Sequence, residues 1–144
     1  MPLPKLSTPT YELEIPSTGK KIKYRPFLVK EEKILLLAME TEDERQMATA
    51  VKTILSNCIQ TPRFKIDTLA LFDIEYIFLN IRGKSVGESV ELNITCPDDG
   101  VTYADVEVDL AKIEVFVDDD HSNNIMIDED RKLGVVMKYP SLKD

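Results

Sequence analysis

Few residues of this 144-residue chain could do nucleophilic or acid–base chemistry. The one histidine, His121, lies in a polar stretch, and spacing alone pairs no serine or cysteine with it. The sequence has no glycine-rich phosphate-binding loop. Its many carboxylates lie on faces expected to be solvated, which does not favour general acid–base catalysis. We therefore predict no catalytic residue and expect His121 to be structural or incidental.

The segment Cys96-Pro-Asp-Asp-Gly100 is similar to the CPxCG turn of a zinc knuckle, but Asp99 stands where the second cysteine would be. A structural zinc site needs four ligands, and no second knuckle follows. We therefore predict no zinc here and interpret the segment as the turn of a hairpin. Cys58 lies in a different predicted element, so both thiols are expected to be reduced and packed.

The acidic stretch 118–129 contains a candidate calcium loop. Asp118, Asp120, Ser122 and Glu129 have the spacing of positions 1, 3, 5 and 12 of a twelve-residue calcium loop. Position 6, which is glycine in such loops, is Asn123, and the flanking residues alternate as strands do. A solvated acidic loop is the favoured interpretation, and we predict no cofactor.

The charge of the chain is unevenly distributed. Residues 1–72 carry 11 Lys and Arg against 9 Asp and Glu, whereas residues 73–144 carry 7 against 17, and the net charge is −8. The acidic half would repel DNA, so nucleic acid is not a predicted partner. Two interpretations of the one basic cluster stay open: a solvated hairpin rim, or a docking face for an acidic protein partner. The cluster comprises Lys20, Lys21, Lys23, Arg25, Lys30 and Lys33.

Composition indicates a globular protein, with 43% hydrophobic and 31% charged residues. A chain of this length can bury enough surface to fold without disulfides or metal. The longest apolar run, 34–39, is far shorter than the roughly 20 residues that span a bilayer. Residues 1–5 lack the apolar core of a signal peptide. We therefore expect a chain that stays in the cytoplasm in which it is made.

The secondary structure that positions these residues begins with a hairpin. Apolar alternation over 11–15 and 22–24, around turn residues 16–19, predicts two strands, and Pro26 ends the second. A first helix is expected over about 30–39.

The second predicted helix has Thr41 as N-cap, with Glu44 three residues further on, and an apolar stripe that reaches Cys58. The third begins near Asp67 and ends at Gly83 as a C-cap. This helix is apolar nearly all round, which is typical of a central core helix or of one that a partner covers. Both interpretations stay open.

After the third helix the apolar period changes to two. Residues 90–96 and 106–110 predict a hairpin, apolar on one face and acidic on the other. Further strands are expected over 113–117, around 125–127 and over 135–139. We therefore predict an α+β fold forming a single compact domain over 1–144, comprising a hairpin (1–28), a three-helix lobe (29–84) and a C-terminal antiparallel β lobe (85–144).

Three stretches of the sequence resemble the baseplate hub proteins of T4-like contractile-tailed bacteriophages. They are Pro16-Ser-Thr-Gly-Lys-Lys-Ile-Lys-Tyr-Arg-Pro-Phe27 with the following Leu-Val-Lys-Glu-Glu-Lys33; Asp73-Ile-Glu-Tyr-Ile-Phe-Leu79 with Arg82 and Lys84-Ser-Val-Gly-Glu88; and Gly134-Val-Val-Met-Lys-Tyr-Pro-Ser141. They occur in the family's order and cover most of the chain.

This resemblance implies a virion or tail-assembly protein without catalytic residues, made in the host cytoplasm and placed in the tail baseplate. Its implied partners are other baseplate and hub proteins, and self-association is an alternative. Some relatives are expected to keep a cysteine at the position of Asp99, which departs from that pattern. Relatives are also expected to continue past Pro140, so the chain would correspond to their N-terminal part.

The expected function is that of a structural hub subunit that acts through protein–protein contacts. The expected contact residues are Arg25 and Phe27, after the first hairpin, and Tyr76, Phe78 and Leu79 on the third helix; burial in the core explains the helical residues equally well. One alternative is a hub-assembly chaperone that is absent from the mature virion. Another is a small metal-binding regulatory protein or enzyme.

Overall fold

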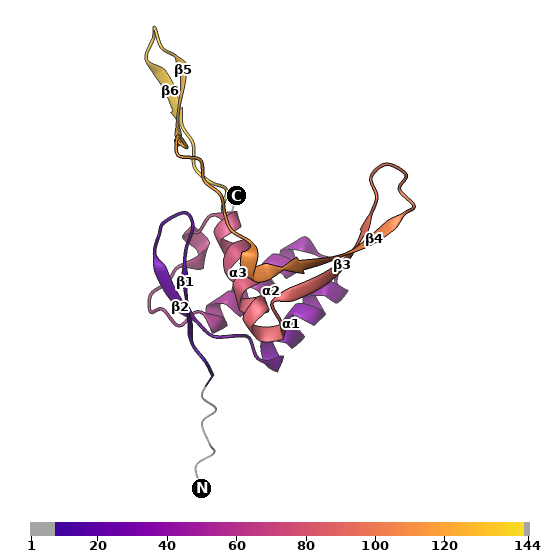
Figure 1. Ribbon diagram of the computed structural model, residues 1–144. Coiled ribbons are helices and arrows are strands. Elements are labelled where there is room, and N and C mark those ends of the chain that lie inside the picture. Colours follow the sequence, from indigo (N-terminus) through magenta and orange to yellow (C-terminus); the bar gives the residue numbers. More distant parts are fainter. Residues whose placement is uncertain (1–7, 143–144) are drawn as a thin grey trace.

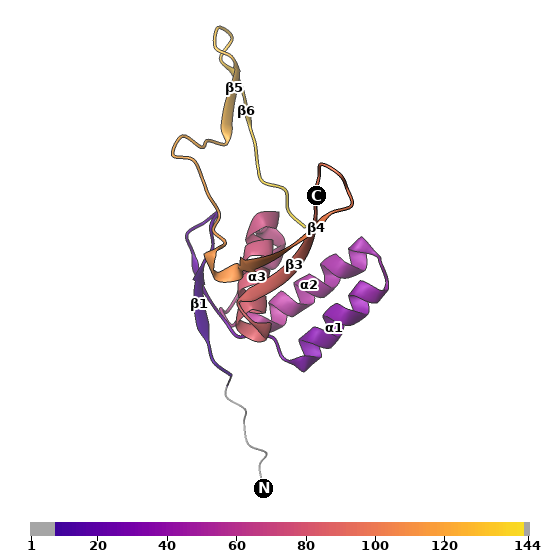
Figure 2. The same ribbon diagram turned by 45° about the vertical axis from the view of Figure 1, so that its right-hand side comes forward.

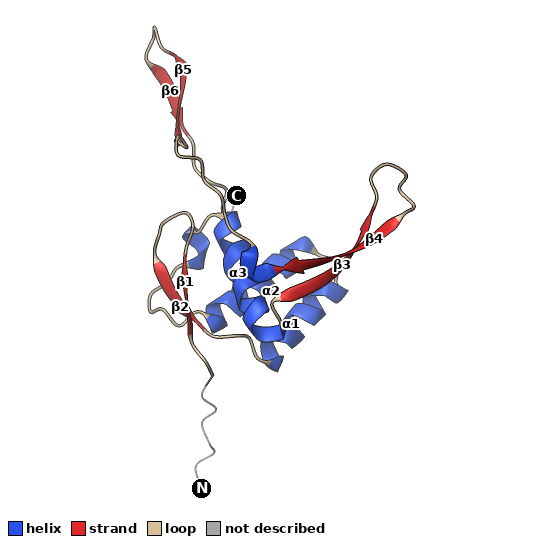
Figure 3. Ribbon diagram, viewed as in Figure 1, coloured by secondary structure: helices blue, strands red, loops and turns tan. Residues whose placement is uncertain are grey.

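The computed structural model describes residues 8–142, and it is of the predicted α+β class. Three helices form the centre of the molecule, and three two-stranded antiparallel hairpins are attached to them (Figures 1 and 3). The start of the chain, for which we predicted no signal peptide, lies outside the described residues. Among the residues described, none of the helices combines the length and the apolar character that crossing a membrane requires.

The first hairpin is confirmed as β1 (Tyr11–Glu14) and β2 (Lys21–Tyr24). Gly19 takes a φ of +65°, which favours glycine, and its N–H donates to the carbonyl of Ile15 at 2.8 Å to close the turn. Beyond the hairpin, Tyr24 forms an isolated antiparallel bridge with Ile59. The outer edge of β2 is thereby attached to the helical body.

The second helix is confirmed as α2 (Glu44–Cys58), but its predicted cap is wrong. The carboxylate of Asp43, not Thr41, accepts the free backbone N–H of Arg45 at 2.9 Å. The Thr41 hydroxyl instead donates to the carbonyl of Ala38 at the end of α1 (Val29–Glu40) at 2.7 Å. The capping-box spacing was misleading because Thr41 and Asp43 are both suitable caps, and the turn between the two helices decides between them.

The third predicted helix divides into two elements. Ile66–Thr68 forms a short 3-10 helix (η1), and α3 (Leu71–Val86) follows after an extended Leu69 and Ala70. Gly83 lies buried inside α3 rather than at its end, and Gly87, with a φ of 141°, is the C-cap. The helix therefore runs one turn further than predicted.

The core lies where the β1–β2 hairpin, α2, η1 and α3 meet, and α3 is its central helix. Burial of these apolar side chains is the main stabilising term of the fold. The buried cluster comprises Ile15, Ile22, Tyr24, Ile54, Leu55, Cys58, Ile66, Leu69, Ile74, Ile77 and Ile81.

The C-terminal strands form two separate hairpins rather than one continuous sheet. β3 (Ser89–Thr95) pairs with β4 (Tyr103–Asp109), and β5 (Asn124–Asp128) pairs with β6 (Leu133–Val136). The two hairpins project from the helical body in different directions (Figures 1 and 2).

The strand predicted over 113–117 does not form. A second 3-10 helix, η2 (Leu110–Lys112), takes the chain away from β4, and an irregular segment leads to β5. The apolar alternation of 113–117 therefore belongs to a connecting segment, in which Phe116 is 86% exposed.

Candidate partner-binding surfaces

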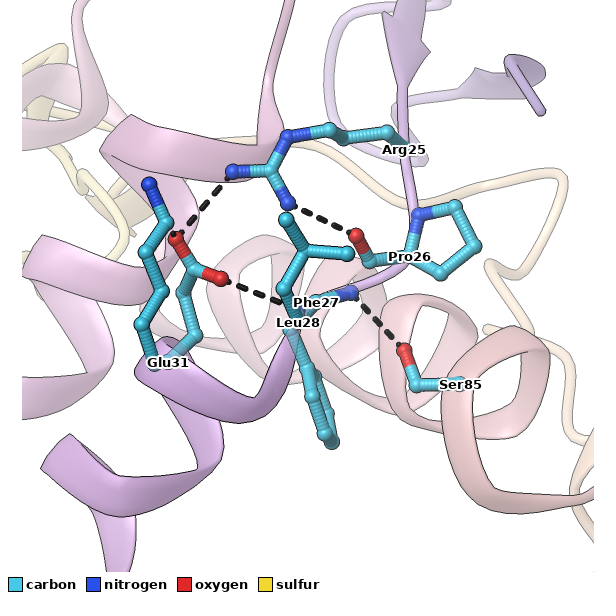
Figure 4. Close-up of polar contacts among 7 residues, drawn as sticks. Arg25, Pro26, Phe27, Leu28, Glu31 and Ser85 are labelled. Carbon is cyan, nitrogen blue, oxygen red and sulfur yellow. Dashed lines mark hydrogen bonds and ion pairs between the residues drawn. The ribbon is translucent and has the colours of Figure 1, made fainter. Parts of the chain in front are cut away.

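Two of the predicted contact residues, Arg25 and Phe27, lie in the junction between β2 and α1. The Arg25 guanidinium donates to the carboxylate of Glu31 at 3.1 Å, and the exposed fractions of these two side chains are 12% and 0% (Figure 4). The same guanidinium donates to the carbonyl of Pro26 at 2.8 Å. The guanidinium of Arg25 thus makes both of these hydrogen bonds within its own chain.

Glu31 is the centre of this junction. Its second carboxylate oxygen accepts the backbone N–H of Leu28 at 2.9 Å, which satisfies a free donor at the start of α1 (Figure 4). Burial alone would raise the pKa of Glu31, but the hydrogen bonds from Leu28 and Arg25 outweigh burial and lower it. Glu31 therefore remains ionised and joins the hairpin to the helix.

Phe27 connects the junction to α3. Its backbone N–H donates to the hydroxyl of Ser85 at 2.9 Å, and its ring is half-buried against the core cluster (Figure 4). Arg25 and Phe27 thus both have an intramolecular role in this structure. A further role in binding a partner stays a prediction.

A second buried carboxylate joins the tip of the first hairpin to α3. Asp73 is fully buried, accepts the backbone N–H of Ser17 at 3.0 Å, and also accepts the Ser17 hydroxyl. Sequence reasoning missed Asp73 and Glu31 as positioning residues. The one local signal was an acidic residue at the third position of each helix, where it can accept backbone N–H groups.

The three predicted contact residues on α3 are half-buried and point to different neighbours. Phe78 packs against the core and lines an open apolar groove of about 760 Å³ between α2 and α3. Leu79 lines a smaller pocket with Leu110, where η2 packs on α3. The carbonyl of Tyr76 accepts the side-chain amide of Asn80 at 2.9 Å. Of these side chains, Phe78 is the one that lines the open groove.

Of the described helices, α1 has the most exposed large apolar side chains, and sequence reasoning did not single it out. It packs mainly on α2, and its outer face leaves Val29, Leu36, Leu37 and Met39 exposed. A continuous apolar run over 34–39 was the available signal, because such a run gives a helix apolar side chains on both its inner and its outer face.

The structure does not bring the candidate calcium residues together. Asp118, Asp120 and Ser122 precede β5, whereas Glu129 follows it, so a whole extended strand separates them. Within residues 8–142, no three His, Cys, Asp or Glu side chains form a group that could hold a metal ion. His121 stacks on Tyr139 at 5.8 Å between ring centroids and forms a hydrogen bond with its hydroxyl, which is a structural contact.

The zinc-knuckle-like segment is the turn between β3 and β4, as predicted. The Asp99 carboxylate accepts the Thr102 hydroxyl and the N–H groups of Thr102 and Val101, the latter two at 2.9 and 3.0 Å. These bonds, with the hydroxyl of Thr102 as the largest cause, lower the pKa of Asp99 to about 2. The aspartate therefore organises the turn through hydrogen bonds.

The two C-terminal hairpins carry most of the remaining uncovered apolar side chains. On the β5–β6 hairpin, Ile125 and Val135 lie opposite each other on one face, and Met126 and Val136 lie on the other face. All four side chains are exposed. The base of this hairpin is fixed to α3 by an edge-to-face contact of Tyr139 with Phe72, whose ring centroids are 4.9 Å apart.

No curated protein and no solved structure matches the chain. A family model described as T4 bacteriophage base plate protein matches residues 8–144, which is nearly the whole sequence. The match agrees with the resemblance of three stretches to baseplate proteins. It also agrees with the many large apolar side chains that the described structure leaves exposed. The chain therefore belongs to the T4 bacteriophage base plate protein family.

Proposed function

We propose that this baseplate protein is a structural subunit of the hub, and that it binds other tail proteins through its projecting hairpins and the outer face of α1. The observation that carries the proposal is the apolar surface of the β5–β6 hairpin, which is exposed on both faces. Exposure of each face to water is unfavourable in proportion to its apolar area, so a partner that covers both faces would be stabilised by their burial.

Both faces of a β hairpin are buried only when the hairpin lies between two layers of protein. We therefore infer that β5 and β6 insert into a slot of a neighbouring tail protein or extend one of its sheets. The free edges of a two-stranded hairpin offer unpaired backbone N–H and C=O groups for such strand addition.

The decisive experiment compares phage carrying the wild-type chain with phage carrying Ile125→Ser and Val135→Ser together. A hub subunit is detected by mass spectrometry in purified wild-type virions in a fixed ratio to the other baseplate proteins. We expect the double variant to fold, because both side chains are exposed, but to be lost from virions. Asn57→Ser and Lys65→Ser, two changes of exposed residues outside the proposed contact surfaces, form the matched control and should leave incorporation unchanged.

The alternative is a hub-assembly chaperone, which would bind the same surfaces of its clients and then leave. It predicts that the wild-type chain is recovered with assembly intermediates and is absent from purified virions. A chain that is found in neither fraction and that binds no tail protein would contradict both proposals.

A further inference from the structure

The β3–β4 hairpin differs from the β5–β6 hairpin because its two faces have opposite character. Leu92 lies opposite Val106 in the strand register, and Glu91 lies opposite Glu107. Since side chains alternate along a strand, the first pair is on one face and the second pair on the other. The apolar face also carries Val90, Ile94, Ala104 and Val108, and the acidic face also carries Asp105 and Asp109.

Nothing in the described structure covers the outer part of the apolar face. The exposed fractions are 44% for Leu92, 48% for Ile94 and 39% for Val106. In the strand register these residues lie closer to the turn of the hairpin than Val90 and Val108, which are partly buried. The tip of the hairpin projects beyond the helices (Figure 1). A patch of this kind on a projecting element indicates a protein-binding surface.

The charge of the hairpin indicates what kind of protein it binds. Residues 85–111 contain seven Asp and Glu and no Lys or Arg. Like charges directly opposite each other destabilise a strand pair, and Glu91 faces Glu107 in this way. Among residues 8–142 the ion pairs of this region lie at its base, between Lys84 and Glu88 and between Lys112 and Asp109, and none includes Glu91 or Glu107.

We propose that the β3–β4 hairpin docks into a basic groove of a different baseplate protein. The apolar floor of that groove would cover Leu92, Ile94 and Val106, and its Lys and Arg side chains would flank the hairpin and pair with Glu91 and Glu107. This inference rests on the proposed function and adds the chemistry of one partner. Complementary charge of this kind speeds association and selects the partner.

A second copy of the chain fits this hairpin less well. Its basic cluster has six cations between residues 12 and 33, but four carboxylates are interleaved with them. One of these cations, Lys23, already pairs with Glu12 at 3.5 Å, and Arg25 is directed inward to Glu31. With a net charge of −8, two copies would also repel each other.

The test uses the substitution Glu107→Lys, which separates binding from folding. It replaces a repulsive cross-strand pair by an attractive one, so the hairpin should be at least as stable as in the wild type. The matched control is Glu75→Lys, which makes the same change of charge at an exposed position of α3, outside the proposed contact surfaces. The probes are the other baseplate proteins of the same phage, each purified separately and titrated with the full chain at low and high salt.

We expect one of these proteins to bind the wild-type chain and the Glu75→Lys control equally. Glu107→Lys should bind it roughly tenfold more weakly at low salt, with a smaller loss at high salt. Equal binding of Glu107→Lys and wild type would overturn the proposal, as would a partner whose binding is insensitive to salt.

Photo-crosslinking identifies the groove itself. A benzophenone side chain placed at Leu92 should crosslink to a segment of another baseplate protein in which Lys and Arg outnumber Asp and Glu. Crosslinks to an acidic segment, to a second copy of this chain, or to no protein would overturn the inference. The proposed function fails separately, through loss of all binding to tail proteins or absence of the wild-type chain from virions.

Discussion

The Arg25 guanidinium and the Glu31 carboxylate form a 3.1 Å ion pair in which the Glu31 side chain has no exposure to solvent. The pair is where the first hairpin changes direction into α1, and Glu31 also accepts the N–H of Leu28 at 2.9 Å. Removing one partner of a buried pair is costly because the other is left without compensation.

Replacing Glu31 by Gln should therefore destabilise the protein, because Arg25 keeps its charge and loses its anionic partner. We expect the free energy of unfolding to fall by about 2 kcal/mol or more, measured by urea denaturation at neutral pH. The control is Glu32→Gln, an exposed neighbour, which should change it by less than about 0.5 kcal/mol. Equal effects of the two substitutions would show that the ion pair does not stabilise the fold.

The same pair makes a pH prediction. The pKa of Glu31 is lowered in the folded protein, so the unfolded chain, in which glutamates have a pKa of about 4.3, binds this proton more tightly. The stabilisation is therefore present above that pH and is lost as the pH falls through the folded pKa. Urea titrations at pH 7 and pH 3 should show a smaller difference between wild type and Glu31→Gln at pH 3. A difference independent of pH would contradict the lowered pKa.

Asp73 should be required to hold the tip of the first hairpin on α3. Asp73→Ala leaves the N–H and the hydroxyl of Ser17 without their acceptor, and we expect a loss of about 1–3 kcal/mol in thermal unfolding. Hydrogen exchange of the Gly19 amide should also be faster in Asp73→Ala than in the wild type. The control is Glu75→Ala, two residues along the same helix and exposed. If both variants have the same melting temperature, the contact between the hairpin and the helix does not stabilise the fold.

The two cysteines should react very differently with a thiol reagent at pH 8. Burial raises the pKa of Cys58 to about 11 and also blocks access, whereas Cys96 is partly exposed beside the β3–β4 turn. We expect one fast-reacting thiol in the native protein and two in urea, and no fast thiol in native Cys96→Ser. Rapid labelling of Cys58 would show that the core opens readily.

Substitutions on the β5–β6 hairpin should leave the stability of the free chain almost unchanged. Ile125→Ser removes an exposed side chain and should alter the free energy of unfolding by less than about 0.5 kcal/mol. Ile77→Ala, in the fully buried centre of α3, should cost about 2–5 kcal/mol by urea denaturation. A large loss with Ile125→Ser would mean that the hairpin packs on its own chain.

Local patterns were sufficient to predict most elements of the fold. Alternation and turn residues identified the hairpins around Gly19 and Gly100, because a strand period of two and a glycine with positive φ are local properties. Helix ends were less predictable. Two suitable caps, Thr41 and Asp43, stand close together, and a glycine such as Gly83 can be buried inside a helix as well as end it.

The contacts that fix the arrangement could not be predicted, because they join residues distant in sequence. Ser17 and Asp73 are 56 positions apart, and Phe27 and Ser85 are 58 apart. Nor could the pattern of 90–96 and 106–110 tell a covered face from an uncovered one. An apolar strand face looks the same in sequence whether the chain itself or another protein buries it.

The apolar character of both faces of the β5–β6 hairpin has a consequence for the timing of assembly. An exposed hairpin with apolar side chains and unpaired strand edges can nucleate aggregation. Free chains would therefore aggregate at a rate that increases with their concentration. The wild-type chain should therefore form insoluble aggregates when it is expressed alone. Its yield in the soluble fraction should rise when the tail protein that binds the hairpin is co-expressed.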